Sequence, residues 1–338
     1  MRRLRRPIIL ALVLAASLGG WLYVSLYVPV GGGRQAIRCT VSAGAPARVV
    51  AAELHERGLI RSAWAFTAAA AWRGAWRHAK AGDYAFRRDM SALEMLHAIG
   101  RGAIISEWVT VPEGYTLAQI AALVAANGLG RGEEFLHAAQ SPVPTDAGFP
   151  LPTGSLEGYL FPDTYRVGRH PGAARDLMKM MLARFDEVVW RGLLGGRSPH
   201  SSLHGVITLA SLIEGEAKLD AERPVVAAVL TNRLKQGLKL ECDATVQYAL
   251  GANRKTRLTY EDLKIESPYN TYLHAGLPPG PINSPGRASI EAALHPAAVG
   301  YLFYVARPDG SHIFSSTYAE HLRAIAHVRA EAKAAARR

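Results

Sequence analysis

The sequence predicts an α+β protein that follows one membrane-spanning helix. Two features predict this class: an uncharged apolar stretch covers residues 7–28, and short β-like runs alternate with segments of helical periodicity from residue 36 onward. The chain has 338 residues, of which 49% are hydrophobic and 20% charged. That length and composition suffice for two folded units behind the helix, so a disordered chain is not expected.

The N-terminal segment has the features of a membrane anchor. Residues 1–6 contain four arginines. The apolar stretch 7–28 would extend roughly 33 Å as a helix, which matches a bilayer core of about 30 Å. Because it exceeds the ~7–15 apolar residues typical of a cleaved signal peptide, we expect a persistent anchor. The arginines place residues 1–6 in the cytoplasm, which leaves the bulk of the chain on the outer side of the inner (cytoplasmic) membrane.

Residues 36–140 are predicted to form the first unit. Ser91 is the expected N-cap of one helix, which Gly100 ends. Thr116 is the expected N-cap of another, which an Asn-Gly pair ends. The expected strands cover residues 36–41, 82–86 and 104–111, and two further helices are expected between residues 49 and 76.

A proline-rich segment between Ser141 and Thr153 marks the predicted boundary, because its four prolines interrupt any regular element. The second unit, residues 141–332, is expected to be the larger one. Its expected helices cover residues 202–218, 224–236 and 319–338, and residues 302–305 and 312–315 are expected to pair as a hairpin.

The sequence lacks the residues that are typical of several functional classes. The net charge is +11, but the basic residues are scattered without a nucleic-acid-binding motif, so anionic envelope polymers and lipid headgroups are the expected partners, not nucleic acid. The sequence lacks the motifs of zinc proteases, P-loop proteins and serine hydrolases. His200 and His204 have no third ligand nearby, so no metal site is predicted. Cys39 and Cys242 are expected to be free thiols in separate units.

Two acids follow an apolar run. Six of the eight residues from Val206 to Ile213 are apolar, and Glu214 comes directly after them. Burial disfavours the ionised form of a carboxyl group, as a general acid near neutral pH requires. Glu216 would point about 160° away on the same helix, so the two acids are expected to play different roles. The alternative for Glu214 is a solvated ion pair with Lys218.

Nine short sequence blocks occur in order along nearly the whole chain. They are Val111–Thr116, Leu156–Tyr165, Ala210–Glu214, Thr231–Leu234, Asp243–Tyr248, Ser267–Tyr272, Gly276–Ile282, His295–Pro296 and His312–Ser315. In these blocks the chain resembles the endolytic murein transglycosylase family, the membrane-anchored YceG-type proteins. Nine ordered blocks are more specific than any single motif.

The resemblance implies a fold and a catalytic residue. In this family the glutamate that follows an Ala-Ser-apolar-apolar sequence is the catalytic acid, which corresponds to Glu214. Gly215 stands where the family often has lysine, whereas Glu216 matches. The family's first unit is described as LysM-like. The implied fold is therefore a small LysM-like α+β domain, then a larger mixed α+β catalytic domain with a lysozyme-like acid on a helix. No cofactor is implied.

The implied activity is cleavage of the bond between N-acetylmuramic acid and N-acetylglucosamine in nascent peptidoglycan strands. Such enzymes leave 1,6-anhydromuramoyl ends instead of adding water. One carboxyl can act as acid and then as base, so no second carboxylate is required. Glu157, Asp243 and Glu216 remain available as a second acid.

Membership of the family motifs suggests which polar groups hold the strand. The candidates are Asn232, Thr245, Gln247, Tyr269, Asn270 and Tyr272. For each of them a structural role is the alternative, because asparagine satisfies loop backbone groups and tyrosine packs in cores with its hydroxyl bonded.

Two other functions stay open on the sequence. One is a muramidase hydrolase with the same acid and with water as the nucleophile, and the other is a non-catalytic peptidoglycan-binding scaffold. An older suggestion for the family, a cytoplasmic aminodeoxychorismate lyase with pyridoxal phosphate, is at odds with the export anchor. The anchor would confine cutting to new strands near the inner membrane, beside penicillin-binding synthases.

Overall fold

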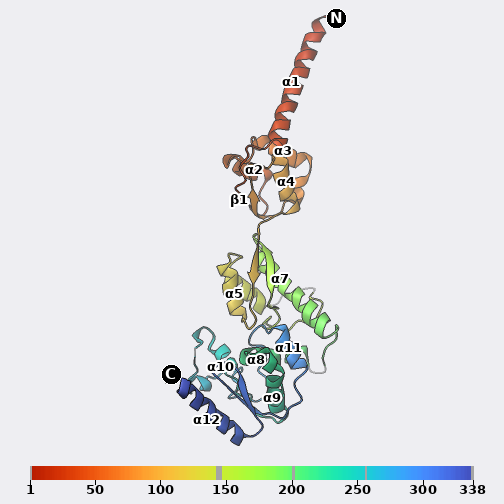
Figure 1. Cartoon of the computed structure of the whole chain (residues 1–338). Coiled ribbons are helices and arrows are strands. Elements are labelled where there is room, and N and C mark those ends of the chain that lie inside the picture. The colour runs from red at the N-terminus through yellow and green to blue at the C-terminus, as the bar shows by residue number, and fades with distance from the viewer. Residues whose placement is uncertain (1, 142–146, 200–201, 256, 336–338) are drawn as a thin grey trace. The chain divides into compact units, whose positions relative to one another are not determined.

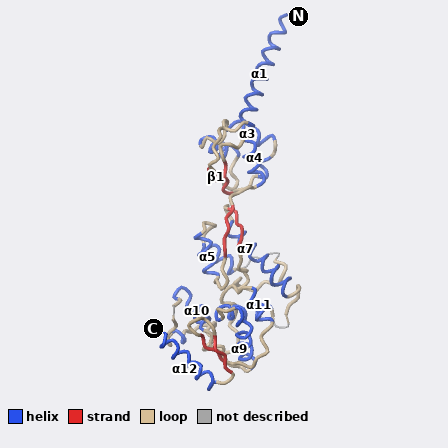
Figure 2. Tube along the Cα trace, in the orientation of Figure 1, coloured by secondary structure: helices blue, strands red, loops and turns tan. Residues whose placement is uncertain are grey.

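The computed structural model describes residues 2–141, 147–199, 202–255 and 257–335. Figures 1 and 2 follow the chain from α1 to α12 and show helices interspersed with short strands. The described strands form three separate two-stranded sheets. This mixed content of helix and strand confirms the coarse fold prediction.

The chain divides into two compact units. The first contains the residues up to Trp108 together with Arg166–Ala173, and the second contains Val109–Tyr165 together with the residues from Ala174 onward. The boundary predicted between residues 140 and 141 lies inside the second unit, and residues 142–146 lie outside the described part of the chain. The limits of a LysM-like and a catalytic domain stay predictions.

Helix α1 (Arg2–Tyr27) contains the N-terminal apolar stretch. Its part from Ile9 to Tyr27 is long and apolar enough to cross a membrane, judged by length and composition. Its large side chains, among them Leu10 and Leu14, are exposed. The helix is therefore compatible with a single-pass anchor, and the side of the membrane on which the chain lies stays a prediction.

The first unit packs one antiparallel strand pair against three helices. In β1 (Ile37–Val41) and β2 (Gly82–Phe86), Cys39 lies opposite Tyr84, and both side chains are buried in the core, as alternation along a strand requires. The helices are α2 (Ala47–Glu56), α3 (Ala63–Trp72) and α4 (Ala92–Arg101), with a 3-10 turn over Ala75–His78. The two strands confirm the predicted ones.

Helix α4 begins at its predicted cap. The Ser91 hydroxyl accepts the Glu94 N–H at 3.2 Å, and the Glu94 carboxylate accepts the Ser91 N–H at 2.7 Å, which makes a reciprocal capping box. The predicted end at Gly100 is wrong by one residue. The helix ends at Arg101 because Gly102, at φ +67°, supplies the left-handed C-cap.

The second unit is mainly helical. Its core contains α8 (Leu203–Glu216), α9 (Arg223–Lys235) and α11 (Arg287–Leu294), which pack against one another. The predicted cap Thr116 begins α5, where its hydroxyl accepts the Gln119 N–H at 3.2 Å. The remaining elements are α5 (Leu117–Ala126), α6 (Gly132–Gln140), α7 (Ala173–Phe185), a π-helix over Asp186–Leu193, α10 (Asp243–Leu250), α12 (Tyr318–Ala335) and 3-10 turns at Asp220–Glu222, Gly251–Asn253 and Asp262–Lys264.

Two further strand pairs complete the fold. Strand β3 (Ser106–Thr110) pairs with β4 (Thr164–Gly168), and β5 (Phe303–Ala306) pairs antiparallel with β6 (His312–Ser315). The β5–β6 pair confirms the predicted hairpin. Cys39 and Cys242 are buried free thiols, one in each unit, as expected.

Candidate active site

Helix α8 carries Glu214 near its C-terminal end. The Ser202 hydroxyl caps the helix by accepting the Gly205 N–H at 3.1 Å. The apolar run from Val206 to Ile213 is buried, so core packing fixes the helix. The Glu214 side chain, directly after that run, is only 8% exposed.

Three donors hold the Glu214 carboxyl group. The Gly286 N–H donates to Oε2 at 2.9 Å, and the Ser289 hydroxyl donates to the same oxygen at 2.8 Å. The Arg223 guanidinium lies 3.3 Å from Oε1, and its side chain is 7% exposed. Arg223 also donates to the Ser289 hydroxyl, which links the cation to both carboxylate oxygens. Glu214 therefore pairs with a buried arginine of α9, not with Lys218 as in the solvated alternative.

The start of α11 supplies the backbone donor. Gly286 is the N-cap of that helix, so its N–H belongs to the end of the helix that favours negative charge. Asn283 fastens the preceding loop to α8 by donating to the Ser211 carbonyl at 2.9 Å. The position of the Glu214 carboxyl thus depends on three packed helices, α8, α9 and α11.

Glu216 lies in a different environment from Glu214. Its carboxyl accepts the Ala244 N–H at 3.4 Å. Burial raises the pKa of Glu216 to about 7, and that N–H opposes the rise. Between the two acids, a Cβ on Gly215 would lie 2.7 Å from the Ala244 Cβ, closer than real Cβ atoms approach. Gly215 therefore leaves room for α10.

Glu113 is a further acid beside Glu214, and sequence reasoning did not single it out. The loop that carries it is tied to the loop before α11, because Gly114 N–H donates to the Ser284 carbonyl at 2.8 Å and Ser284 N–H donates to the Tyr115 carbonyl at 2.8 Å. Burial, followed by the charge of Glu214, raises the pKa of Glu113. Its place in the Val111–Thr116 block was the signal that could have drawn attention to it.

Glu157, which the sequence left open as a second acid, accepts hydrogen bonds inside the second unit. Its two carboxylate oxygens accept the Leu117 N–H at the start of α5 at 3.0 and 3.2 Å, and the Tyr248 hydroxyl at 3.2 Å. The residue is 5% exposed. Burial raises the pKa of Glu157 to about 7, against these hydrogen bonds.

This raised pKa predicts a pH dependence of stability. Because the folded chain favours the protonated Glu157, its stabilising contribution is full below the ordinary pKa near 4.5 and is lost as the pH rises through about 7. At about 1.4 kcal/mol per pKa unit, the loss is on the order of 3 kcal/mol. Glu157→Gln should flatten the dependence of the melting temperature on pH, without abolishing it, since Glu216 contributes in the same sense. An unchanged pH dependence in that variant, with exposed Glu291→Gln as the control, would contradict the assignment.

Two of the six predicted strand-binding residues are engaged in the second unit's interior. The Asn232 amide donates to the carbonyls of Val299 and Tyr301 at 2.8 and 3.0 Å. Thr245 is fully buried, and its hydroxyl donates to the Cys242 carbonyl at 2.7 Å. These contacts match the structural alternative, and contact with a strand stays a prediction for both residues.

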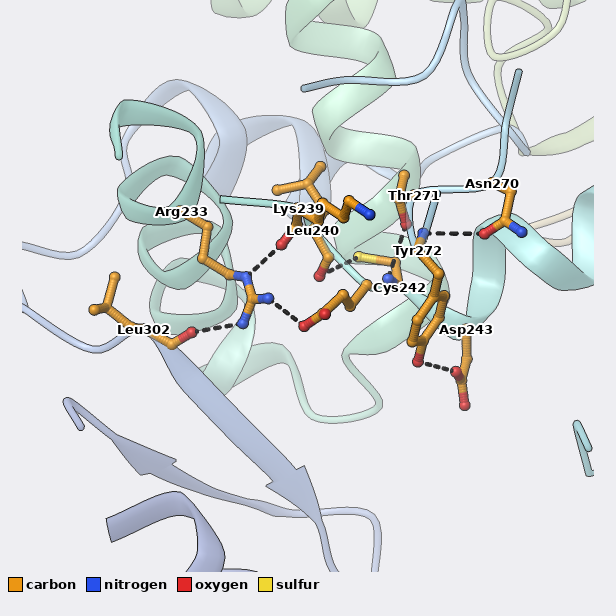
Figure 3. Close-up of polar contacts among 10 residues, drawn as sticks. Arg233, Lys239, Leu240, Cys242, Asp243, Asn270, Thr271, Tyr272 and Leu302 are labelled. Atoms are coloured by element: carbon orange, nitrogen blue, oxygen red, sulfur yellow. Dashed lines mark hydrogen bonds and ion pairs between the residues drawn. The ribbon is translucent and has the colours of Figure 1, made fainter. Parts of the chain in front are cut away.

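Asn270 and Tyr272 form a connected set of hydrogen bonds (Figure 3). Fully buried Asn270 donates to the carbonyls of Leu263 and Ile265, both at 2.9 Å, and its amide oxygen accepts the Tyr272 N–H at 3.0 Å. The Tyr272 hydroxyl donates to Asp243 at 2.6 Å, so this acid too has an internal partner. The set orders the loop after residue 262.

The last two candidates lie nearer the surface. Gln247 donates to the Lys255 carbonyl at 2.7 Å and accepts the Lys255 N–H at 3.0 Å. The Tyr269 ring lies 4.8 Å from the Tyr248 ring, centroid to centroid. A substrate role for Gln247 and Tyr269 stays a prediction, whereas the groups that hold Glu214 come from Arg223 and from α11.

Comparisons with known proteins agree on one family. The sequence model of the YceG-like family matches residues 39–327. An endolytic murein transglycosylase of Bacillus subtilis (strain 168) is 34% identical over 322 residues, which cover 90% of this chain and 89% of that protein. An endolytic murein transglycosylase of Streptococcus pneumoniae serotype 2 is 28% identical over 354 residues, with coverage of 94% of this chain but only 63% of that longer protein.

A solved structure shows the same fold. The crystal structure of a YceG-like protein from Listeria monocytogenes matches with a TM-score of 0.56 at 32% sequence identity, and the match covers 86% of this chain and 99% of that one. The matched segment contains Glu214 and the groups around it. On both sequence and structure, the chain belongs to the YceG-like family.

Proposed function

We propose that the chain is a peptidoglycan lytic transglycosylase that cuts within glycan strands between N-acetylmuramic acid and N-acetylglucosamine. Membership of the YceG-like family and relatives named endolytic murein transglycosylases support the activity. The observation that carries the site assignment is the nearly buried Glu214 carboxyl, held by Arg223, Ser289 and the Gly286 N–H. Glu214 acts first as the acid and then as the base.

The reaction requires two proton transfers, one from Glu214 and one back to it from a different group. Protonated Glu214 gives its proton to the glycosidic oxygen, the bond from that oxygen to C1 of the muramic acid breaks, and the electron pair stays on the leaving oxygen. C1 and the ring oxygen then share a positive charge. The C6 hydroxyl attacks C1 and returns its proton to the Glu214 carboxylate. No water is consumed, and the product carries a 1,6-anhydro ring.

The donors around Glu214 suit this cycle. Between the two steps the residue is a carboxylate, and Arg223, Ser289 and the Gly286 N–H are already directed at its oxygens. Donors that are fixed in advance stabilise the charge without reorganisation when it forms. They also fix the carboxyl in one orientation, as transfer of the proton to one particular oxygen requires.

The anchor and the first unit have roles in the same proposal. Helix α1 would hold the catalytic unit outside the cytoplasm, close to strands newly made at the inner membrane, beside penicillin-binding synthases. A LysM-like first unit would bind glycan. The length and composition of α1 support the anchor, and the relatives named endolytic murein transglycosylases support action on murein.

The nature of the new ends is the first test. Digestion of purified glycan strands by the full-length chain in detergent is expected to give 1,6-anhydromuramoyl ends, which mass spectrometry distinguishes from reducing ends by the mass of one water. Reducing ends would show that water is the nucleophile and that the protein is a muramidase hydrolase. Strands left intact would indicate a non-catalytic scaffold.

A further inference from the structure

Glu113 and Glu214 both lie next to Gly286. The N–H of Gly286 donates to Glu214 at 2.9 Å. A Cβ built on the same glycine would lie 2.0 Å from one Glu113 carboxylate oxygen and 2.6 Å from the other. The Glu113 carboxyl therefore lies over the Cα atom of Gly286, next to the group that holds Glu214.

Gly286 is needed for space, not for its backbone conformation. Its φ of −75° and ψ of 170° belong to a region that any L-residue adopts. Gly114, at φ +73°, is different, because its left-handed conformation favours glycine by itself. A Cβ at Gly286 would displace the Glu113 carboxyl, the end of a side chain that lies where the Cβ would be. The glycine at position 286 therefore leaves the space that the Glu113 carboxyl occupies.

The backbone holds Glu113 in this place. Two backbone hydrogen bonds of 2.8 Å join the Glu113 loop to Ser284. The Ser284 carbonyl accepts the Gly114 N–H, and the Ser284 N–H donates to the Tyr115 carbonyl. A Cβ on Gly114 would lie 3.7 Å from the Glu214 Cγ, so the same loop lies next to Glu214. Both carboxyls are therefore carried by segments fixed to each other.

The two carboxyls differ in their partners. Glu214 has three donors, whereas no hydrogen bond or ion pair holds the Glu113 carboxyl among residues 2–141, 147–199, 202–255 and 257–335. Glu113 is exposed as a residue, although its carboxyl is partly buried. A carboxylate that stands beside another acid without a cation of its own is complementary to a positive charge that develops on the substrate during the reaction.

Resting on the proposed function, we propose that Glu113 is a second catalytic carboxyl, whose negative charge stabilises the positively charged sugar ring formed when Glu214 protonates the leaving oxygen. Glu113 forms no bond and transfers no proton. Glu214 gives its proton to the leaving oxygen, where it stays, and takes a different proton from the C6 hydroxyl as that oxygen bonds to C1. The charge on the ring exists only during bond cleavage, so Glu113 acts on kcat more than on substrate binding.

The first test removes the charge of Glu113 and keeps its shape. Glu113→Gln in the full-length chain should lower kcat on purified glycan strands by roughly 10²–10³-fold, the range for one electrostatic group in an active site, with little change in KM. Glu113→Asp, which keeps the charge, should recover part of the activity. Glu291→Gln, on an exposed ion pair of α11, is the matched control and should match the unsubstituted chain. A fully active Glu113→Gln, or a loss confined to KM, would overturn the inference.

The second test uses the glycine. Gly286→Ala should displace the Glu113 carboxyl and lower kcat, whereas Gly300→Ala, where a Cβ meets open space at ordinary φ, should not. In a Glu113→Ala background the carboxyl that a Cβ at residue 286 would meet first is gone, so adding Gly286→Ala should cause no further loss. A further tenfold loss in that background would show that Gly286 acts only through its N–H to Glu214, against the inference.

A pH profile separates a charge role from a structural one. The charged groups that act on Glu113 are Glu214, Arg223 and Asp220. If Glu113 acts ionised, kcat falls as the pH drops through its raised pKa, and Glu113→Gln loses that fall while circular dichroism and the melting temperature stay unchanged. An unaltered low-pH limb would contradict the role. If Glu214→Gln is inactive and Glu113→Gln is fully active, only this inference fails; an active Glu214→Gln would instead remove the proposed function.

Discussion

Glu214→Gln is expected to lower strand cleavage by at least roughly 10²–10⁴-fold, the range that general acid–base catalysis contributes. The amide has nearly the same size, and its oxygen can still accept the Gly286 N–H and the Ser289 hydroxyl. It can neither give a proton to the leaving oxygen nor take one from the C6 hydroxyl. Because Glu214 serves both steps in the proposed mechanism, the loss should lie toward the upper end of that range.

The measurement is the rate of appearance of new strand ends from purified glycan, with the full-length chain in detergent. Glu291→Gln is the control, since it makes the same chemical change on α11 in an exposed pair with Arg287 and should keep full activity. The melting temperature of Glu214→Gln should show a folded chain. Cleavage at the unsubstituted rate would rule out Glu214 as the acid.

The elements with strong local signals could be predicted from the sequence. Ser91 and Thr116 are the predicted caps that the structure confirms. Each hydroxyl accepts the N–H three residues on, and the side chain of that later residue accepts the N–H of the cap residue. The apolar run before Glu214 predicted α8, and the turn between residues 305 and 312 predicted the β5–β6 hairpin. The short elements α10 and α11 have only eight residues each, too few for helical periodicity to stand out, and their helicity depends on packing.

The candidate site shows the same limit more sharply. Glu214 could be found because its apolar run is local in sequence. Arg223, Gly286 and Ser289 come from other segments, and they reach the acid only because α9 and α11 pack against α8. Glu113 lies in the Val111–Thr116 block, but its closeness to Glu214 depends in the same way on distant segments packing together. Motif membership also could not tell internal hydrogen bonds from substrate contacts, as fully buried Asn270 illustrates.

Arg223→Met is expected to destabilise the second unit by about 3–5 kcal/mol, the usual effect of removing one partner from a buried ion pair. Arg223 and Glu214 are 7% and 8% exposed, so water cannot replace the lost cation. Thermal unfolding of the full-length chain should show the loss. Arg287→Met, which breaks an exposed pair on α11, should change stability by no more than about 0.5 kcal/mol.

A double-mutant cycle shows why the chain retains this pair. In a Glu214→Gln background no carboxylate is left without its cation, so Arg223→Met should destabilise less, with a coupling of about 0.5–3 kcal/mol. An equal loss in both backgrounds would mean that Arg223 acts through Asp220 and Ser289 instead. Buried ion pairs are often no more stabilising than apolar groups of the same shape. Stability alone is therefore a weak reason to keep Arg223, whereas in the proposed mechanism the Glu214 carboxylate forms in every turnover and the fixed Arg223 cation would stabilise it each time.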